Sequence, residues 1–280
     1  MRTVSLLLLS FLLAQAQPVS FLVMGKTTNH RQDPSTSART LLNYHFFAEI
    51  FVREGGGVTD ASLSFPGGSE QRFDDLGFVL ELHGGRYGDE GALDRSYPAG
   101  AYRFRYRTPA GAVDRVMELK PEGRAGIPPP ARIVLRQEGR NVPADSVDSA
   151  KDLVVTWSEF EGGAADPNGI LDDLIFVVLG DCRGEKTVHS GRPFEGKPFL
   201  TYATKEYVIP KEKLRAGEPH QMFVEHATVE TSEEEGVVGL VTYASTTFLD
   251  FRTRGDTPGP PCPPRMPPID QGQTDRKEVP

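Results

Sequence analysis

The stretch "AYRFRYRTPAGAVDRVMEL", residues 101–119, carries the clearest pattern in the chain and decides the fold class. Its first half alternates strictly, with Tyr102, Phe104 and Tyr106 at every second position and arginines between them. Successive side chains of a β-strand point to opposite faces, so this alternation predicts a strand with one aromatic and one basic face. We expect the rings to fill a core and the arginines to face solvent.

Similar apolar runs fill the rest of the chain, and helical spacing is nearly absent. Examples are "YHFFAEIFV" at residues 44–52, "DLVVTWSEF" at 152–160 and "HQMFVEHATVE" at 220–230. Gly- and Pro-rich turns separate these runs. Strands of this length with frequent turns indicate an all-β chain built from antiparallel β-sandwiches.

A proline-rich connection, "PEGRAGIPPPAR" at residues 121–132, divides the chain. It has no apolar period, and its triple proline favours an extended spacer. The sequence therefore predicts two antiparallel β-sandwich domains in tandem, at residues 17–126 and 127–253. Residues 254–280 are rich in proline and polar residues, and we expect them to form a disordered tail.

Residues 1–16 have the features of a secretory signal peptide: Arg2, an apolar run from Val4 to Leu13, and a small-x-small end at Ala14 and Ala16. We expect a secreted or periplasmic protein. The apolar run is about half of the roughly 20 residues that span a bilayer, so no membrane span is expected. The net charge of −8 argues against nucleic acid as a partner.

The second predicted domain, over residues 130–252, resembles fibronectin type III-like or immunoglobulin-like modules. In "DLVVTWSEF", Leu153, Val155 and Trp157 share one face, as in the second strand of such modules. The stretch "YVIPKEKLRAGEPHQMFVEHA", residues 207–227, is similar to their E strand, corner and F strand. Leu214 and Gly217 fit the corner, whereas His220 stands where these modules have a tyrosine. The resemblance implies a sandwich and no particular activity.

The basic face of the first stretch is a candidate binding site. Arg103, Arg105 and Arg107 would be spaced about 6.6 Å apart along the strand. Guanidinium groups in such a row suit an anionic extracellular polymer or an acidic partner protein. The alternative is a solvated outer face without a ligand.

A second candidate site lies in "AADPNGILDD", residues 164–173. It is not an EF-hand loop, because Leu171 replaces the invariant glycine and Val177 stands where the bidentate glutamate belongs. In an immunoglobulin-like sandwich, however, the B–C and F–G loops emerge at the same end, which would bring "ETSEEEG" at residues 230–236 nearby. We therefore expect two solvated acidic loops or, alternatively, a calcium site. Its candidate ligands are Asp166, Asn168, Asp172, Asp173, Glu233 and Glu234.

Catalysis finds little support in the sequence. No nucleophile elbow, zinc-protease motif or nucleotide loop is present, and no cofactor is predicted. His220 and His226 are six residues apart on a predicted strand, hence roughly 20 Å apart, so we expect core histidines and no shared metal. Cys182 and Cys262 leave open whether they pair.

The sequence favours an exported, non-catalytic binding or structural module that holds an extracellular polymer or another exported protein. The alternative is an exported hydrolase with a cation-dependent site at the acidic end of the second domain. The ligand itself is not predicted.

Overall fold

The chain folds into three β-sheets. The computed structural model describes residues 17–120, 126–181, 186–255, 262 and 274–275. Within these residues one sheet has ten strands and two have four. The ten-stranded sheet, called the large sheet below, has the order β13-β12-β16-β17-β1-β2-β6-β18, with β14 beside β12 and β5 beside β6. Its strands are β1 (Val19–Gln32), β2 (Arg39–Val52), β5 (Asp74–Asp75), β6 (Val79–Tyr87), β12 (Leu174–Gly180), β13 (Lys186–His189), β14 (Leu200–Thr201), β16 (Pro219–Glu234), β17 (Val237–Arg252) and β18 (Thr274–Asp275).

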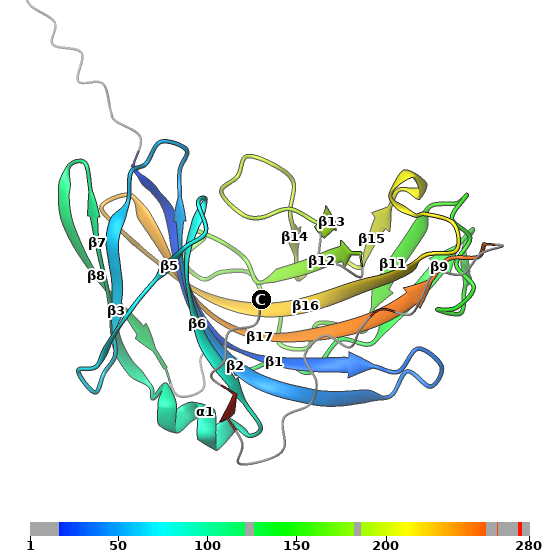
Figure 1. Cartoon of the computed structure of the whole chain (residues 1–280), viewed down its shortest axis with the longest axis horizontal. Coiled ribbons are helices and arrows are strands. Elements are labelled where there is room, and N and C mark those ends of the chain that lie inside the picture. Colours follow the sequence, from blue (N-terminus) through cyan, green and yellow to red (C-terminus); the bar gives the residue numbers. More distant parts are fainter. Residues whose placement is uncertain (1–16, 121–125, 182–185, 256–261, 263–273, 276–280) are drawn as a thin grey trace, which may run out of the picture.

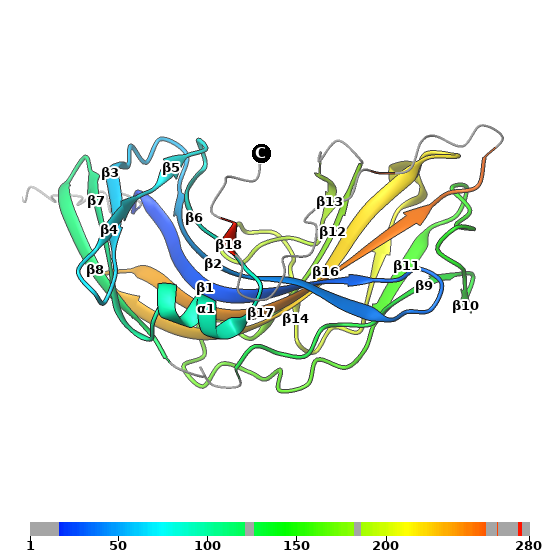
Figure 2. The ribbon, with the colours of Figure 1, turned by 60° about the horizontal axis from the view of Figure 1, so that its bottom comes forward.

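Two small sheets lie at opposite ends of the large sheet (Figures 1 and 2). The β7 sheet has the order β4-β3-β7-β8, and the β11 sheet has the order β10-β9-β11-β15. A short helix, α1, joins β6 to β7, and a 3-10 turn, η1, precedes β16. The bounds are β3 (Thr59–Ser64), β4 (Glu70–Arg72), α1 (Glu90–Ser96), β7 (Gly100–Thr108), β8 (Gly111–Leu119), β9 (Ile133–Gln137), β10 (Arg140–Asn141), β11 (Leu153–Trp157), β15 (Glu206–Ile209) and η1 (Lys211–Lys213). The predicted all-β sandwich fold is confirmed.

The alternating stretch at residues 101–119 forms the β7–β8 hairpin, as predicted. Tyr102, Phe104 and Tyr106 are at most 3% exposed, and they belong to the core between the β7 sheet and the large sheet. The arginines between them face outward. Period-two alternation therefore predicted both the strand and the face that it buries.

Four strands of the large sheet are unusually long and contribute to both ends of the molecule. β1 and β2 have 14 residues each, and β16 and β17 have 16. At about 3.3 Å per residue such strands extend roughly 50 Å. Val241 and Tyr243 of β17 pack in the core of the β7 sheet, whereas Leu249 and Phe251 pack in the core of the β11 sheet. One strand thus serves two cores.

The tandem arrangement of two separate domains is not confirmed, because the large sheet takes strands from both sides of the predicted boundary. β1 pairs in parallel with β17, from Phe21 opposite Val238 to Arg31 opposite Phe248. The proline-rich connection instead lies where the chain passes from the β7 sheet to the β11 sheet, between β8 and β9; residues 121–125 lie outside the described residues. It marks a change of small sheet and does not divide the large one.

The residues quoted for the immunoglobulin-like resemblance occupy the β11 end. Leu153 and Val155 are fully buried in its core, and Leu214 is buried at the corner. Gly217 has a φ of 74°, which suits a residue without a Cβ at a tight turn. His220 stacks on Phe251 with ring centroids 5.0 Å apart. The fibronectin type III assignment stays a prediction.

The two faces of the large sheet differ. Alternate residues of its long strands pack against the small sheets, and the residues between them point to the opposite side, called the open face below. Phe21, Val23, Leu240 and Ala244 lie on the open face in a third apolar cluster. Loop residues such as Phe194 cover this cluster in part. In Figure 2 the long strands curve, and β6 and β13 rise on the two sides of their middle.

The ends of the chain are described only in part. The predicted signal peptide, residues 1–16, lies outside the described residues. Of the predicted tail, Thr274–Asp275 form β18 and pair with the end of β6. Cys262 is disulfide-bonded, and Cys182 lies outside the described residues. None of the helical segments in the described ranges has the length and apolar character that crossing a bilayer requires.

Candidate functional site

The predicted arginine site is exposed, but its charges are already balanced. Arg103 pairs with Asp114 at 2.7 Å, Arg105 pairs with Glu70 at 3.1 Å, and the Arg107 guanidinium lies 3.5 Å from an Asp60 oxygen. Asp60 and Asp114 come from β3 and β8, the two strands that flank β7, and Glu70 comes from β4 beyond β3. The row is therefore a ladder of surface ion pairs, and its use as an anion site stays a prediction.

Asp166, the first predicted calcium ligand, is used by its own loop. Its carboxylate accepts hydrogen bonds from the backbone N–H groups of Asn168, Ile170 and Leu171. The hydroxyl of Thr231 on β16 donates to it at 2.7 Å. These donors lower the pKa of Asp166 although partial burial acts in the opposite direction. The carboxylate shapes a turn and ties it to β16.

Asp173 has a similar structural role. It is fully buried, and its two oxygens accept from the N–H groups of Ala164 and Val229. Asp172 accepts from the N–H of Asp166, and Asn168 donates to the backbone oxygen of Thr231. These predicted ligands do lie close together, but their carboxylate oxygens accept hydrogen bonds from backbone N–H groups.

Glu233 and Glu234 lie on a strand, which is a correction to the predicted loop. The segment expected to be the F–G loop is the end of β16, and only Glu235 and Gly236 form the turn, both with positive φ. Glu234 pairs with the buried Arg115 of β8 at 2.8 Å. Among the described residues no three His, Cys, Asp or Glu side chains are placed to hold a metal ion. The calcium site itself stays a prediction.

The two histidines of β16 are core residues, as predicted. His220 is 4% exposed and His226 is 1% exposed. His226 stacks on Phe160 at 4.5 Å, and burial lowers its pKa to about 4. A neutral ring packed on an aromatic ring serves the core.

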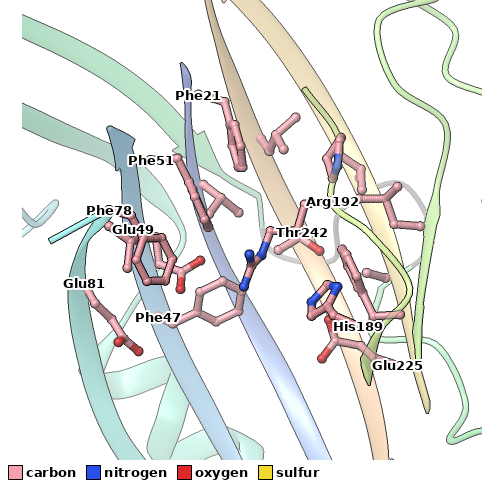
Figure 3. Close-up of a pocket in the computed structure, with 18 of the residues that line it drawn as sticks. Phe21, Phe47, Glu49, Phe51, Phe78, Glu81, His189, Arg192, Glu225 and Thr242 are labelled. Atoms are coloured by element: carbon pink, nitrogen blue, oxygen red, sulfur yellow. The ribbon is translucent and has the colours of Figure 1, made fainter. Parts of the chain in front are cut away.

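The most developed site lies on the open face and was not predicted. A pocket of about 380 Å³ extends across the large sheet from β6 to β13. Figure 3 shows its phenylalanine rings and carboxylates arranged around the guanidinium of Arg192. Its aromatic residues are Phe21, Phe47, Phe51, Phe78, Phe176 and Phe223, and its charged or titratable residues are Glu49, Glu81, Lys186, His189, Arg192 and Glu225. A mostly apolar hollow with a few polar groups is typical of a ligand site.

Strand alternation positions these side chains. On β2, Phe47, Glu49 and Phe51 line the pocket, whereas Phe46 and Ile50 face the covered core. The same alternation aims Glu81 of β6 and Glu225 of β16 into the pocket. Each carboxylate is held on a strand paired on both sides, so the pocket floor is rigid.

Glu49 and Glu81 stand directly opposite each other on paired antiparallel strands. Facing residues of such strands have Cβ atoms about 5 Å apart, and like charges there are destabilising. Within the described residues neither carboxylate has a hydrogen bond or an ion pair. Burial, followed by the charges of Glu81 and Glu225, raises the pKa of Glu49 to about 7, although Arg192 and Lys186 act against this.

Glu225, the third pocket carboxylate, has a partner. It accepts a hydrogen bond from the hydroxyl of Thr246 at 2.5 Å, and burial raises its pKa. His189 stands nearby on β13, and burial, with Arg192 and Lys186, lowers its pKa to about 4. His189 is therefore neutral at pH 7 and adds no charge to the pocket.

The connection from β13 to β14, residues 190–199, crosses the pocket and is called the strap below. Its Arg192 guanidinium lies 5.9 Å from the ring centroids of both Phe51 and Phe78. Arg192 also pairs with Glu195 of the strap at 3.3 Å, and Phe194 packs against Phe21 at 5.3 Å. Gly191 closes the base of the strap, since a Cβ there would lie 1.9 Å from the backbone oxygen of Pro198.

Thr242 of β17 completes the pocket floor. It is 6% exposed, and its hydroxyl has no hydrogen-bond partner. Its register partner on β1 is Gly25, where a Cβ would lie 2.2 Å from the Thr242 backbone oxygen. Only glycine fits at position 25, because the Thr242 Cγ2 atom would also lie 2.5 Å from a Cβ there. A buried hydroxyl without a partner on a pocket wall is a position where a ligand group is expected.

Three sequence stretches contain a pattern from which the pocket could have been predicted. "FAEIF", "VLELH" and "FVEHA" each place one glutamate inside an apolar strand. Burying a charged side chain beneath a second sheet costs free energy. Three apolar strands that each carry one glutamate therefore predict that the face with the glutamates is not covered by another sheet. Which strands are neighbours is not visible in the sequence, and the encounter of Glu49 with Glu81 depends on it.

Comparisons with known proteins add little. No protein-family model matches the chain, and no curated protein matches it. Among solved structures, the chain is similar to the titin domains Z1Z2 solved in complex with telethonin, at 12% sequence identity and a TM-score of 0.20. That match covers 85% of this chain and 95% of the other. A TM-score this low supports no conclusion on function.

Proposed function

We propose that the chain is a non-catalytic binding protein that holds a partner molecule in the pocket on the open face of the large sheet. The observation that carries this proposal is an aromatic pocket on a sheet face that no small sheet of the described chain covers. Exposed apolar surface costs free energy in water, and a contiguous patch of it marks a binding surface. Phe78 and Leu76 at the rim are 61% and 55% exposed.

The position of the charges supports the same proposal. Glu49 and Glu81 face each other without partners, an arrangement that destabilises the fold and that core packing does not require. Local conflicts of this kind concentrate at functional sites. Secretion or export, predicted from residues 1–16, fits a protein that presents such a face outside the cell, and it stays a prediction.

The test uses a neutral apolar dye, N-phenyl-1-naphthylamine, whose fluorescence rises in an apolar site. We expect saturable binding by the full chain and at least about a tenfold loss of affinity in Phe51→Ala, since a large ring is removed from the pocket wall. Val116→Ala, which removes an exposed apolar side chain from β8, is the matched control. Equal dye binding in both variants would overturn the proposal.

A hydrolytic use of the pocket is the second candidate, because one observation favours it. A carboxyl group with a pKa near 7, across from a second carboxylate, resembles the acid and nucleophile pair of glycoside hydrolases. Aryl glycosides test it: turnover by the wild type that is lost in Glu49→Gln, with dye binding unchanged, would replace the binding proposal with a catalytic one.

A further inference from the structure

The proposed binding function leaves the chemistry of the ligand open, and three features of the pocket narrow it. The first is charge. Three carboxylates line the pocket against two cations, Lys186 and Arg192, and Arg192 is already paired with Glu195. Glu49 and Glu81 thus have unused acceptor oxygens that face each other. A group placed between them is favoured if it is positive and donates hydrogen bonds.

The second feature is an independent acceptor on the pocket floor. Thr242 is 6% exposed, and its buried hydroxyl has no hydrogen-bond partner. Thr242 lines the same pocket as Arg192 (Figure 3). In the register of the sheet Thr242 lies in one row with Gly25 and Phe47, two residues along from the row of Glu49, so a ligand that contacts both must extend along the pocket floor.

The third feature is the aromatic lining. The faces of phenylalanine rings attract cations, and the chain already uses this: Arg192 stands over both Phe51 and Phe78. The strap therefore shows, with the chain's own residues, which kind of group these rings accept. Its Phe194, two residues later, packs on Phe21. A basic side chain followed by a ring is thus compatible with this surface.

The rim favours a polypeptide over a small free cation. Leu76 and Phe78 stay more than half exposed at the rim of the pocket, and Phe223 of the pocket forms an edge-to-face pair with the half-buried Phe248. A small cation would fill the hollow and leave this apolar rim in water. A peptide segment would also cover the rim with its neighbouring side chains.

We infer that the pocket binds a lysine or arginine side chain of a partner polypeptide, with its charged end between Glu49 and Glu81 and adjoining apolar side chains on the phenylalanine rim. This inference rests on the proposed binding function and names the class of its ligand.

The test uses isothermal titration calorimetry with the full chain to compare three tripeptides that differ only in the central residue. They are acetyl-Phe-Lys-Phe-amide, the same peptide with Nε-acetyl-lysine, and acetyl-Phe-Glu-Phe-amide. We expect the lysine peptide to bind about tenfold more tightly than the acetyl-lysine peptide, since acetylation removes the charge and keeps the stem. The glutamate peptide should bind most weakly.

Variants assign the effect to the site. Glu49→Gln with Glu81→Gln should remove the preference for lysine over acetyl-lysine, and a thermal melt should show that this variant is folded. Glu70→Gln with Asp114→Asn, which removes two acids from the β7 sheet, is the matched control and should keep the preference. Arg192→Gln should tighten lysine binding, because it removes a competing cation, whereas it would weaken binding of an anion.

The outcomes separate this inference from the proposed function. If lysine and acetyl-lysine peptides bind equally and both depend on Phe51, the cation inference is overturned and the binding proposal stands. Tighter binding of the glutamate peptide, lost in Arg192→Gln, would overturn the inference in favour of an anionic ligand. If no peptide binds, the inference fails, and the dye titration still decides the proposed function on its own.

Discussion

Phe46 and Phe47 are neighbours in the sequence of β2, yet they lie in opposite environments. Phe46 is fully buried in the core of the β7 sheet, where it stacks on Tyr97 at 4.1 Å. Phe47 is half-buried and lines the pocket on the open face. One face of the large sheet is closed by the small sheets, and the other exposes rings and unpaired carboxylates. The same strands thus provide stability on one side and a binding surface on the other.

The largest expected change in stability comes from removing a large side chain from the covered face. Phe46→Ala should lower the free energy of unfolding by about 3–5 kcal/mol, because a buried ring is lost and a cavity is left. Phe47→Ala, the matched control, should lower it by about 1 kcal/mol or less, since its ring is partly in water already. Urea unfolding followed by tryptophan fluorescence measures both. Equal losses of unfolding free energy in the two variants would mean that the ring of Phe47 is also fully buried in solution.

Glu49→Gln tests the open face, and its expected effect is smaller and of opposite sign. The pKa of Glu49 is raised from its ordinary 4.5 to about 7, so the folded chain retains a proton that the unfolded chain releases. Stability provided by this group is therefore lost as the pH rises from about 4.5 to 7. Glutamine does not titrate and does not repel Glu81. After discounting for its partial exposure, the variant should be about 1–2 kcal/mol more stable than the wild type at pH 8.

The pH dependence distinguishes this explanation from a general packing gain. The difference between Glu49→Gln and the wild type should be small at pH 4.5, grow through pH 7 and then level off. Urea unfolding at pH 4.5, 6, 7 and 8 measures it. A difference that is constant across this range would contradict the raised pKa of Glu49.

The smallest effect is expected at the arginine ladder, which belongs to neither face of the large sheet. Changing Arg103, Arg105 and Arg107 together to serine removes exposed ion pairs, each of which contributes about 0–1 kcal/mol. The thermal midpoint should fall by only a few degrees. Retention on an acidic polysaccharide matrix tests the predicted anion site, and unchanged retention would exclude it.

The long strands explain which parts of the fold could be predicted. Alternation at residues 102–107 and 153–157 correctly predicted a strand, the face that it buries and the residues in the core. The side-chain period of a strand is a local property. The large sheet continues across the predicted domain boundary at residues 126 and 127, because β1 pairs with β17 and this pairing joins residues more than 200 positions apart. No local pattern encodes such a partner.

The candidate site follows the same division. The expected nearness of "AADPNGILDD" to β16 holds at Asp166 and Thr231, but the carboxylates bind backbone N–H groups that the sequence does not reveal. The pocket was missed although its glutamates are visible in three strands. Their meaning depends on strand order, which places Glu81 opposite Glu49 and leaves the other sheet face uncovered.

The sequence by itself determined the all-β class, the buried aromatic face of β7 and the core histidines of β16, because these depend on alternation and apolar content along a few residues. Only the tertiary structure decided that one sheet joins both ends, that Asp166, Asp172 and Asp173 accept hydrogen bonds from backbone N–H groups, and that an aromatic pocket opens on the large sheet. Each of these depends on which distant strands pair, and pairing is fixed by the packing of the whole chain.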